Sequence, residues 1–193
     1  MMPEANDNLM ARLRAGEKTA VEEIDRLYGN ELRLFCQRMV YNEVLAEDIV
    51  QDVLMTCCRV DRVAKPTESL RGWLYKIARN RSIDELRRMR PKARLSALQS
   101  SRQVWMKSAI PIDPLTTPAG KAVKQDRVHR VQLAIDAIDD DLREVVIMYF
   151  FQGLSRTELS EAIGLSLSGA KARIAKATRL LRQKLRALDD SAL

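Results

Sequence analysis

The side chains that could carry out chemistry argue against catalysis. The 193-residue chain has one histidine, His129. A metal site with several histidine ligands is therefore excluded, and a serine–histidine–aspartate triad would depend on this single residue. The three cysteines, Cys36, Cys57 and Cys58, are too few and too unevenly spaced for a disulfide framework or a zinc site. We expect them to be reduced thiols. The sequence therefore predicts no catalytic residue, no metal and no cofactor.

An acidic cluster within residues 43–59 is the first candidate binding surface. Ile49, Val53 and Cys57 recur at helical spacing and predict a buried stripe. The polar residues that project away from this stripe are Glu47, Asp48, Gln51 and Asp52. In an otherwise basic chain, this surface suits a basic region of a partner protein. A solvated helix face and a metal-binding carboxylate pair are alternatives that the spacing leaves open.

Residues 69–90 interleave aromatic rings with cations. Single-stranded DNA binding combines rings that stack on bases with cations that contact phosphates. The candidates are Trp73, Tyr75, Lys76, Arg79, Asn80, Arg81, Arg87 and Arg88. For Trp73, an ordinary core position is the alternative. The pattern predicts a helix that ends at Arg79, with the Asn80 amide just beyond it, within reach of a base edge, and a short helix over 82–89.

Residues 153–188 predict a helix-turn-helix. Gly164 supplies the permissive backbone of a tight turn, and Ser155 and Ser166 are candidate N-caps. Residues 166–188 hold seven Lys or Arg and no acid, while an apolar stripe that starts at Leu167 predicts the packed face. The candidate DNA contacts are Ser155, Arg156, Ser166, Ser168, Lys171, Arg173 and Lys176. A solvated basic helix is the alternative.

The elements that position these residues are helices throughout. Helical periodicity predicts further helices over 7–15, 18–28, 30–41, 126–138 and 142–151, and we find no alternating strand pattern. Prolines and polar residues replace the periodicity between 91 and 125, and residues 87–107 carry seven basic residues and no acid. The predicted fold is all-α: two small helical domains, 1–90 and 126–193, joined by a flexible basic linker over 91–125.

The overall composition favours a polyanionic partner. The net charge is +7 and the isoelectric point is about 9.5. The apolar fraction of 46% supports real cores, whereas 5% aromatic residues and seven glycines favour helices over sheets. No apolar run approaches the roughly 20 residues that span a bilayer. The opening MMPEANDNLM lacks a signal-peptide pattern. We expect a cytoplasmic protein with no membrane insertion.

Four segments in a fixed order carry a family resemblance. They are LYGNELRLFCQRMV, AEDIVQDVLMTCCR, SLRGWLYKIARNRSIDELRR and, after the linker, LREVVIMYFFQGLSRTELSEAIGLSLSGAKARIAKATRLLRQKL. Together they closely resemble the extracytoplasmic-function sigma factors of bacterial RNA polymerase, which have regions 2 and 4 of the sigma-70 superfamily. The resemblance covers about residues 20–90 and 128–187.

The resemblance implies a partner for each candidate surface. AEDIVQDV, with Asp48, Gln51 and Asp52, is similar to the region 2 helix that binds the largest subunit of core RNA polymerase. The stretch 73–88 is similar to the part that opens and reads the promoter −10 element, and a loop that captures a flipped base would place Arg79, Asn80 and Arg81 at its pocket. The C-terminal helix-turn-helix is similar to the reader of the −35 element. An anti-sigma protein is a further implied partner.

The sequence departs from the family pattern at two places. IDDDLREV stands where relatives have a proline-containing turn, and SGAKARI stands where a GTVKSRL-like recognition pattern is usual. Two functions remain as rivals: a helix-turn-helix regulator that does not bind polymerase, and an enzyme that binds a metal through Asp48, Asp52 and Asp84. The pattern assigns no role to Trp105.

Overall fold

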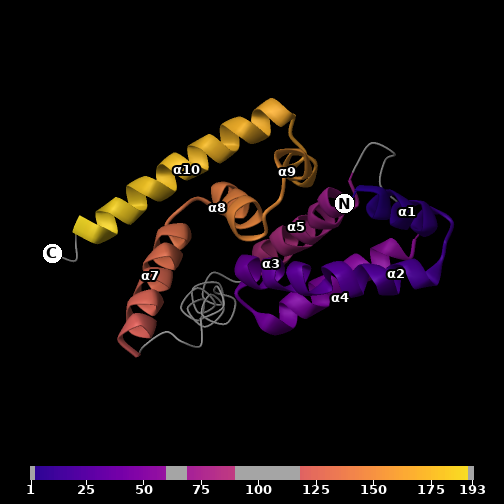
Figure 1. Ribbon diagram of the computed structural model, residues 1–193, viewed down its shortest axis with the longest axis horizontal. Coiled ribbons are helices and arrows are strands. Elements are labelled where there is room, and N and C mark those ends of the chain that lie inside the picture. Colours follow the sequence, from indigo (N-terminus) through magenta and orange to yellow (C-terminus); the bar gives the residue numbers. More distant parts are fainter. Residues whose placement is uncertain (1–2, 60–68, 90–117, 191–193) are drawn as a thin grey trace.

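The computed structural model describes residues 3–59, 69–89 and 118–190, and every regular element in them is a helix (Figure 1). The predicted all-α class is confirmed. The N-terminal half contains α1 (Pro3–Arg14), α2 (Lys18–Ile24) continued by a π-helical turn (Asp25–Gly29), α3 (Asn30–Val40), α4 (Glu43–Cys57) and α5 (Leu70–Arg88).

The C-terminal half contains α7 (Pro118–Asp136), α8 (Asp140–Val146) continued by a π-helical turn (Ile147–Phe151), α9 (Arg156–Ile163) and α10 (Leu167–Asp190). α7 therefore begins inside the stretch predicted as linker. Proline is favoured in the first turn of a helix, because its fixed φ suits a helix start. Linker residues 91–117, including Trp105, lie outside the described part of the chain.

The N-terminal half is a bundle in which α3, α4 and α5 pack around a common core. Phe35, Val50 and Leu74, one from each helix, are fully buried. The chain reverses between α3 and α4 at Tyr41, which has a left-handed φ of 55°, and the Asn42 side chain then accepts a 3.0 Å hydrogen bond from Leu45 N. This cap starts α4 and sets which of its faces enters the core.

The predicted break at Asn80 is wrong, because α5 runs unbroken from Leu70 to Arg88. Ser69 caps its start, accepting a 3.0 Å hydrogen bond from Gly72 N. The buried face continues through Ala78, Ser82 and Leu86 at helical spacing. No glycine or proline lies between Asn80 and Arg88, so packing carries the helix past Asn80.

The helix-turn-helix prediction is confirmed in its local detail. Ser155 Oγ accepts a 3.2 Å hydrogen bond from Glu158 N, and the Glu158 carboxylate accepts a 2.7 Å bond from Ser155 N, forming a capping box. Gly164 ends α9 at φ 69°, ψ 31°, and Ser166 Oγ accepts a 3.2 Å bond from Gly169 N at the start of α10. The turn therefore uses the residues that the sequence marked for it.

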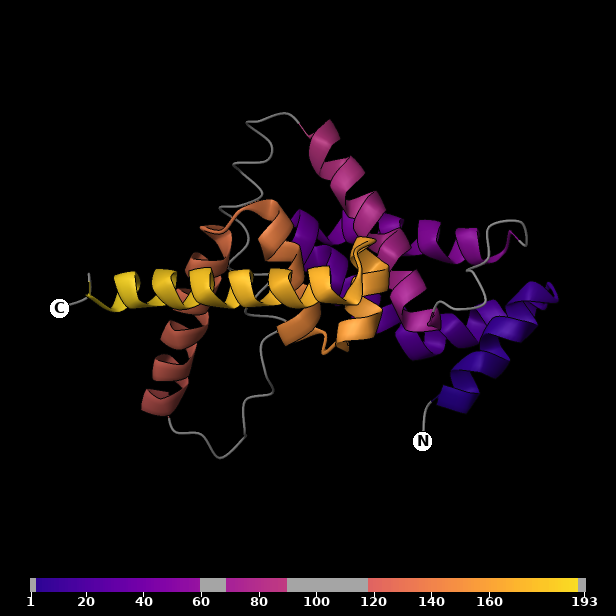
Figure 2. The same ribbon diagram turned by 90° about the horizontal axis from the view of Figure 1, so that it is seen from above.

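The two halves pack against each other (Figures 1 and 2). α5 lies against α9, and α8 approaches the end of α3. We call this packing of α8 and α9 onto α3 and α5 the closed arrangement. α10 packs on α8, α9 and α7 and extends away from the N-terminal bundle. None of the described helices has the length and apolar character needed to cross a membrane.

Candidate nucleic-acid interface

The residues predicted to read duplex DNA lie at the start of α9 and along α10. Six of the seven are exposed: Ser155, Arg156, Ser166, Ser168, Lys171 and Lys176. The opposite side of α10 is packed, since Ala170 and Ala177 are fully buried. The seventh residue, Arg173, is partly buried and donates a 2.9 Å hydrogen bond to Asp141 of α8. The structure thus presents a basic helix face to solvent, as major-groove reading requires.

Leu167 corrects one detail of the predicted packing. The apolar spacing predicts it on the packed face of α10, yet its exposure is 44%, and the neighbouring Leu165 is 39% exposed. Both lie at the turn, before the buried stripe of α10 begins at Ala170. Exposed apolar side chains beside a basic helix start can contact thymine methyl groups. Sequence reasoning placed Leu167 on the packed face because it fits the apolar spacing, and it did not consider Leu165.

The two predicted stacking aromatics are core residues in this structure. Tyr75 is fully buried, and its ring centroid lies 5.1 Å from that of Phe35. Trp73 is 5% exposed. Neither ring offers a face to a base in the closed arrangement. These rings are therefore not exposed for the stacking on single-stranded DNA that the sequence predicted. Instead, their buried apolar surface packs α5 against the neighbouring helices.

The three residues predicted at the base pocket lie on helical turns of α5, not in a loop. Arg79 donates from Nε and Nη2 to the Glu144 carboxylate of α8, at 2.8 Å each. Its Nη1 also donates to Asn80 Oδ1 at 3.3 Å. Asn80 is exposed, and Arg81 lies 3.7 Å from Asp52 of α4. Only Asn80 is fully presented to solvent.

Glu144 is held in an environment that disfavours its charge. The side chain is 2% exposed, and burial raises its pKa, against the opposing effect of the Arg79 guanidinium. The bidentate geometry supplies two charge-assisted hydrogen bonds. The pair therefore fixes how α8 sits on α5.

The remaining cations predicted for the −10 element extend to the C-terminal end of α5. Arg87 and Arg88 have side-chain exposures of 77% and 72%. They pair within the helix, Arg87 with Asp84 at 3.8 Å and Arg88 with Glu85 at 2.6 Å. Lys76 is partly buried. Exposed pairs of this kind are weak, so Arg87 and Arg88 are accessible to a phosphate backbone.

In the predicted acidic cluster on α4, one residue is hydrogen-bonded within the protein and others are exposed to solvent. Glu47 accepts hydrogen bonds from Arg33 of α3 and from Gln51 at 3.2 Å, and the bond to Arg33 lowers the pKa of Glu47. Asp48 and Gln51 are exposed. They share one helix face with Val44 and Met55, which are 71% and 54% exposed. The spacing 44–48–51–55 signals this face, but sequence reasoning considered only its polar residues.

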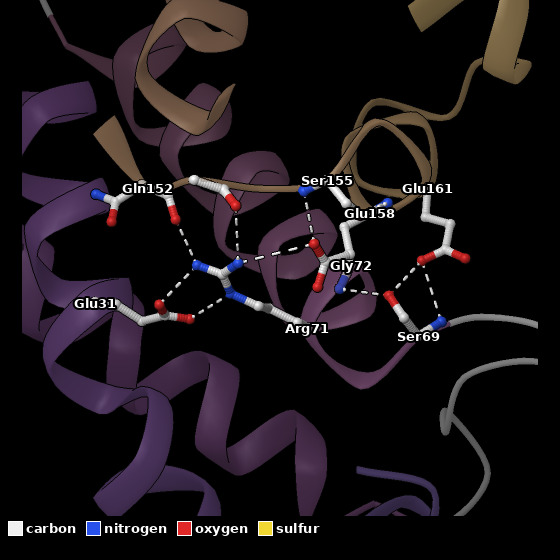
Figure 3. A network of polar contacts seen from close by, with 9 residues as sticks. Glu31, Ser69, Arg71, Gly72, Gln152, Ser155, Glu158 and Glu161 are labelled. Atoms are coloured by element: carbon white, nitrogen blue, oxygen red, sulfur yellow. Dashed lines mark hydrogen bonds and ion pairs between the residues drawn. The ribbon is translucent and has the colours of Figure 1, made fainter. Parts of the chain in front are cut away.

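Arg71 joins the two halves of the chain and was not predicted. Its guanidinium forms a bidentate pair with Glu31 of α3, at 2.9 Å for each bond (Figure 3). It also donates to the backbone carbonyl oxygens of Gln152 and Gly153, and it lies 3.8 Å from Glu158. One side chain of α5 therefore touches both the loop before α9 and the capping box of α9.

A second set of contacts seals the start of α5 against α9. Glu161 accepts hydrogen bonds from Ser69 N at 3.1 Å and from Ser69 Oγ at 2.6 Å (Figure 3). Further along the interface, Arg143 of α8 is 2% exposed and donates to Tyr41 Oη at 3.2 Å and to Met39 O at 3.4 Å. Such pairings depend on residues far apart in the chain, which explains why periodicity gave no hint of them.

Comparisons with known proteins match both halves of the chain. The sequence profile of Sigma-70 region 2 matches residues 25–91, and that of Sigma-70, region 4 matches residues 129–181. The ECF RNA polymerase sigma factor SigW of Bacillus subtilis (strain 168) is 27% identical over 92% of this chain and 95% of its own length. The chain belongs to the sigma-70 family, in its ECF branch.

Other relatives match this chain over nearly its whole length. The RNA polymerase sigma factor CnrH of Cupriavidus metallidurans is 25% identical over 99% of this chain and 98% of its own length. The solved structure of CnrH in complex with the cytosolic domain of CnrY matches with a TM-score of 0.65 at 24% identity, covering 97% of this chain and 98% of that one. A structure of the sigma factor RpoE with the anti-sigma factor NepR from Bartonella quintana gives 0.58 at 23% identity, covering 86% of this chain and 96% of that one. These structures support the same two-domain fold.

Proposed function

We propose that this chain is a promoter-specificity subunit that directs bacterial core RNA polymerase to −35 and −10 promoter elements and starts DNA melting. The observation that carries the proposal is the conjunction, in one ECF chain, of a solvent-facing basic helix-turn-helix and a region 2 bundle with an exposed α4 face. The catalytic machinery belongs to the polymerase, so the chain itself is non-catalytic in this proposal.

The −35 element is read by α10. Ser168, Lys171 and Lys176 stand exposed on the first turns of this helix, where side chains reach base edges and phosphates. Ser155, Arg156 and Ser166 flank them at the N-termini of α9 and α10, where the helix dipole favours phosphate. Arg173 joins the contact once DNA competes with Asp141 for its guanidinium.

Core polymerase docks on the exposed face of α4. Asp48 and Gln51 supply the polar contacts, and Val44 and Met55 supply apolar area at either end of the same stripe. An apolar patch with a few polar anchors has the composition of a stable protein interface. Glu47 and Asp52 contribute less directly, since Arg33 and Arg81 already occupy them.

The −10 element is bound along α5. Arg87 and Arg88 meet the backbone of the opened strand, and Asn80 presents its amide to a base. Arg79 and Arg81 complete the surface when their carboxylate partners release them. In this proposal the protein works in the cytoplasm, and an anti-sigma protein is its regulatory partner, as the solved structures with CnrY and NepR suggest.

The decisive experiment is co-purification of the chain with bacterial core RNA polymerase, followed by transcription from a pool of genomic fragments. Stable association together with new start sites supports the proposal, and alignment of those sites gives both promoter elements. Retained duplex binding without polymerase association would instead make the protein an ordinary helix-turn-helix regulator.

A further inference from the structure

We propose that the second half of α10 is a separate contact for duplex DNA, which binds the phosphates beside the −35 element without reading their sequence. Arg179, Arg182 and Arg186 form this contact, and we call them the arginine face. The proposal rests on the proposed function, because it takes α10 as the reader of −35 DNA. Its test uses the free chain and random-sequence duplex, so the outcome does not depend on polymerase.

The arginine face is exposed, and its charges are not neutralised. Its three side chains recur at steps of three and four, so they lie on one side of the helix. Within the described part of the chain, no carboxylate pairs with any of them. The next acids in the sequence, Asp189 and Asp190, have side chains outside the described part. Like charges at this spacing destabilise a helix, and a bound polyanion would replace that repulsion with attraction.

The exposed arginines at the end of α5 differ from the arginine face. Arg87 and Arg88 each pair with an acid of their own helix, Asp84 and Glu85. These pairs balance the charge of α5 locally. The arginine face has no such balance among the described residues, which makes it the stronger candidate for a polyanion.

The helix that carries the arginine face is packed along its other side. The Sigma-70, region 4 match ends at residue 181, but α10 continues to Asp190. Ile174 and Leu181 pack against the core, and Leu185 and Leu188 are partly buried at the same spacing. α7 packs on α10, and Figure 2 shows α10 with no described helix in front of it. The arginine face is therefore presented to solvent by a supported helix.

The side of α10 that reads the −35 element leads directly into the arginine face. Ser168 lies eleven positions before Arg179, which is about three helical turns, so both lie on the same side. Arg182 lies about 21 Å further along the axis than Ser168, because a helix rises about 1.5 Å per residue. The major groove is only about 12 Å wide. When Ser168 is in the groove, the arginine face therefore lies over neighbouring phosphates.

The chemistry of this surface suits the DNA backbone. Guanidinium groups make charge-assisted, often bidentate hydrogen bonds to phosphate oxygens. The three arginines line a groove of about 770 Å³ together with Gln183, whose amide also donates to phosphate. Among the described residues that line this groove, none is acidic and none is aromatic. The groove thus lacks the rings on which single-stranded bases stack, and duplex DNA is its better match.

The salt dependence of duplex binding tests the charge of the arginine face. The probe is a fluorescein-labelled duplex of random sequence, several helical turns long, titrated with the full chain at several salt concentrations. Arg182→Ala with Arg186→Ala should lower the slope of log affinity against log salt by about 1.8, because each phosphate contact contributes about 0.9. Arg182→Lys with Arg186→Lys keeps both charges and should retain the parent slope.

A matched control removes two arginines elsewhere. Arg14 and Arg26 are exposed on α1 and on the π-helical turn after α2, and both elements lie away from α10 (Figure 1). Arg14→Ala with Arg26→Ala should keep the parent slope. Alanine favours helix at least as well as arginine, so both alanine pairs should keep their helical content. Circular dichroism checks this.

A photocrosslink tests direct contact, which long-range electrostatic attraction alone would not produce. Cys58 is exposed and is replaced by serine, whereas Cys36 and Cys57 are buried. A short aryl azide attached at Ala187→Cys, next to Arg186, should then crosslink to the duplex. The same reagent at Ala11→Cys, an exposed position on α1, should not.

The proposal requires both a reduced slope and a crosslink from position 187. An unchanged slope in Arg182→Ala with Arg186→Ala, an equal fall in the control pair, or no crosslink would overturn it. A parent chain that does not bind the duplex at low salt would also overturn it. Failure to associate with core polymerase would count against the proposed function alone, because neither readout contains polymerase.

Discussion

Arg81 of α5 and Asp52 of α4 lie 3.7 Å apart, and they belong to two different predicted surfaces, one for DNA and one for polymerase. Both side chains are between 40% and 50% exposed, so the pair contributes little to stability. The pair places α4, the helix proposed to bind polymerase, beside α5, the helix proposed to bind the opened DNA strand. A substitution at Asp52 therefore disturbs both surfaces, and Asp48 is the cleaner probe of docking.

Asp48→Arg should weaken binding to core polymerase on the order of tenfold, because it reverses an exposed charge that we propose meets a basic surface of the polymerase. Asp48 lies outside the buried stripe of α4, so thermal stability should stay close to that of the parent. Fluorescence anisotropy with labelled chain and purified core enzyme measures the affinity. Glu22→Arg is the charge-matched control, and equal losses in both variants would remove α4 from the docking role.

Lys171→Ala combined with Arg173→Ala should reduce binding to duplex −35 DNA. The slope of log affinity against log salt should fall by about 0.9 for each phosphate that the variant no longer neutralises. Polymerase binding should be unaffected, since both residues lie on α10, away from α4. Titrations at several salt concentrations provide the slope. A parallel loss of polymerase affinity would contradict the division of labour between the halves.

Acidification should favour the closed arrangement through Glu144. Burial raises its pKa above the usual 4.5, so the closed state binds a proton there more tightly than an open state with a hydrated carboxylate. The stabilisation is fully present below the usual value and is lost as the pH rises through the raised pKa. The groups around Glu144 are Arg79 from α5, Arg173 from α10 and Asp141 on α8.

The distance between spin labels at the exposed Cys58 and at an Ala187→Cys substitution on α10, recorded from neutral pH downwards, tests this dependence. The population in which the two halves are packed together, with one narrow label-to-label distance, should grow as the pH falls. Glu144→Gln cannot titrate, so it should remove the part of the pH dependence that Glu144 causes. If the parent and Glu144→Gln respond to pH identically, another group is responsible.

The three thiols should differ sharply in reactivity. Burial raises the pKa of Cys36 and of Cys57 to about 12, which leaves almost no thiolate at neutral pH, whereas Cys58 is exposed. A chromogenic disulfide reagent should titrate one thiol rapidly in the folded chain and three in denaturant. Rapid reaction of a second thiol without denaturant would show that the core around α3 and α4 opens more readily than its packing suggests.

Local signals in the sequence were enough to define the helix-turn-helix and the caps. Ser69, Ser155 and Ser166 cap their helices because a hydroxyl must meet the free N–H groups of a first turn wherever that turn lies. Gly164 takes a left-handed conformation that other residues adopt only at a cost. The all-α class follows equally from periodicity within each helix.

Tertiary packing decided what local signals left undetermined. Tyr75 looks like a stacking ring in the sequence, but Phe35 of α3 covers it, and α5 passes the expected break at Asn80 because its buried face finds continuous support. The hydrogen bonds of Arg71 and those of the Arg79–Glu144 pair join residues separated by 40 to 82 positions, so no periodic pattern in the sequence predicts them. Sequence periodicity reports which face of a helix is apolar, whereas only the assembled fold determines which partner covers that face and which charges come within bonding distance.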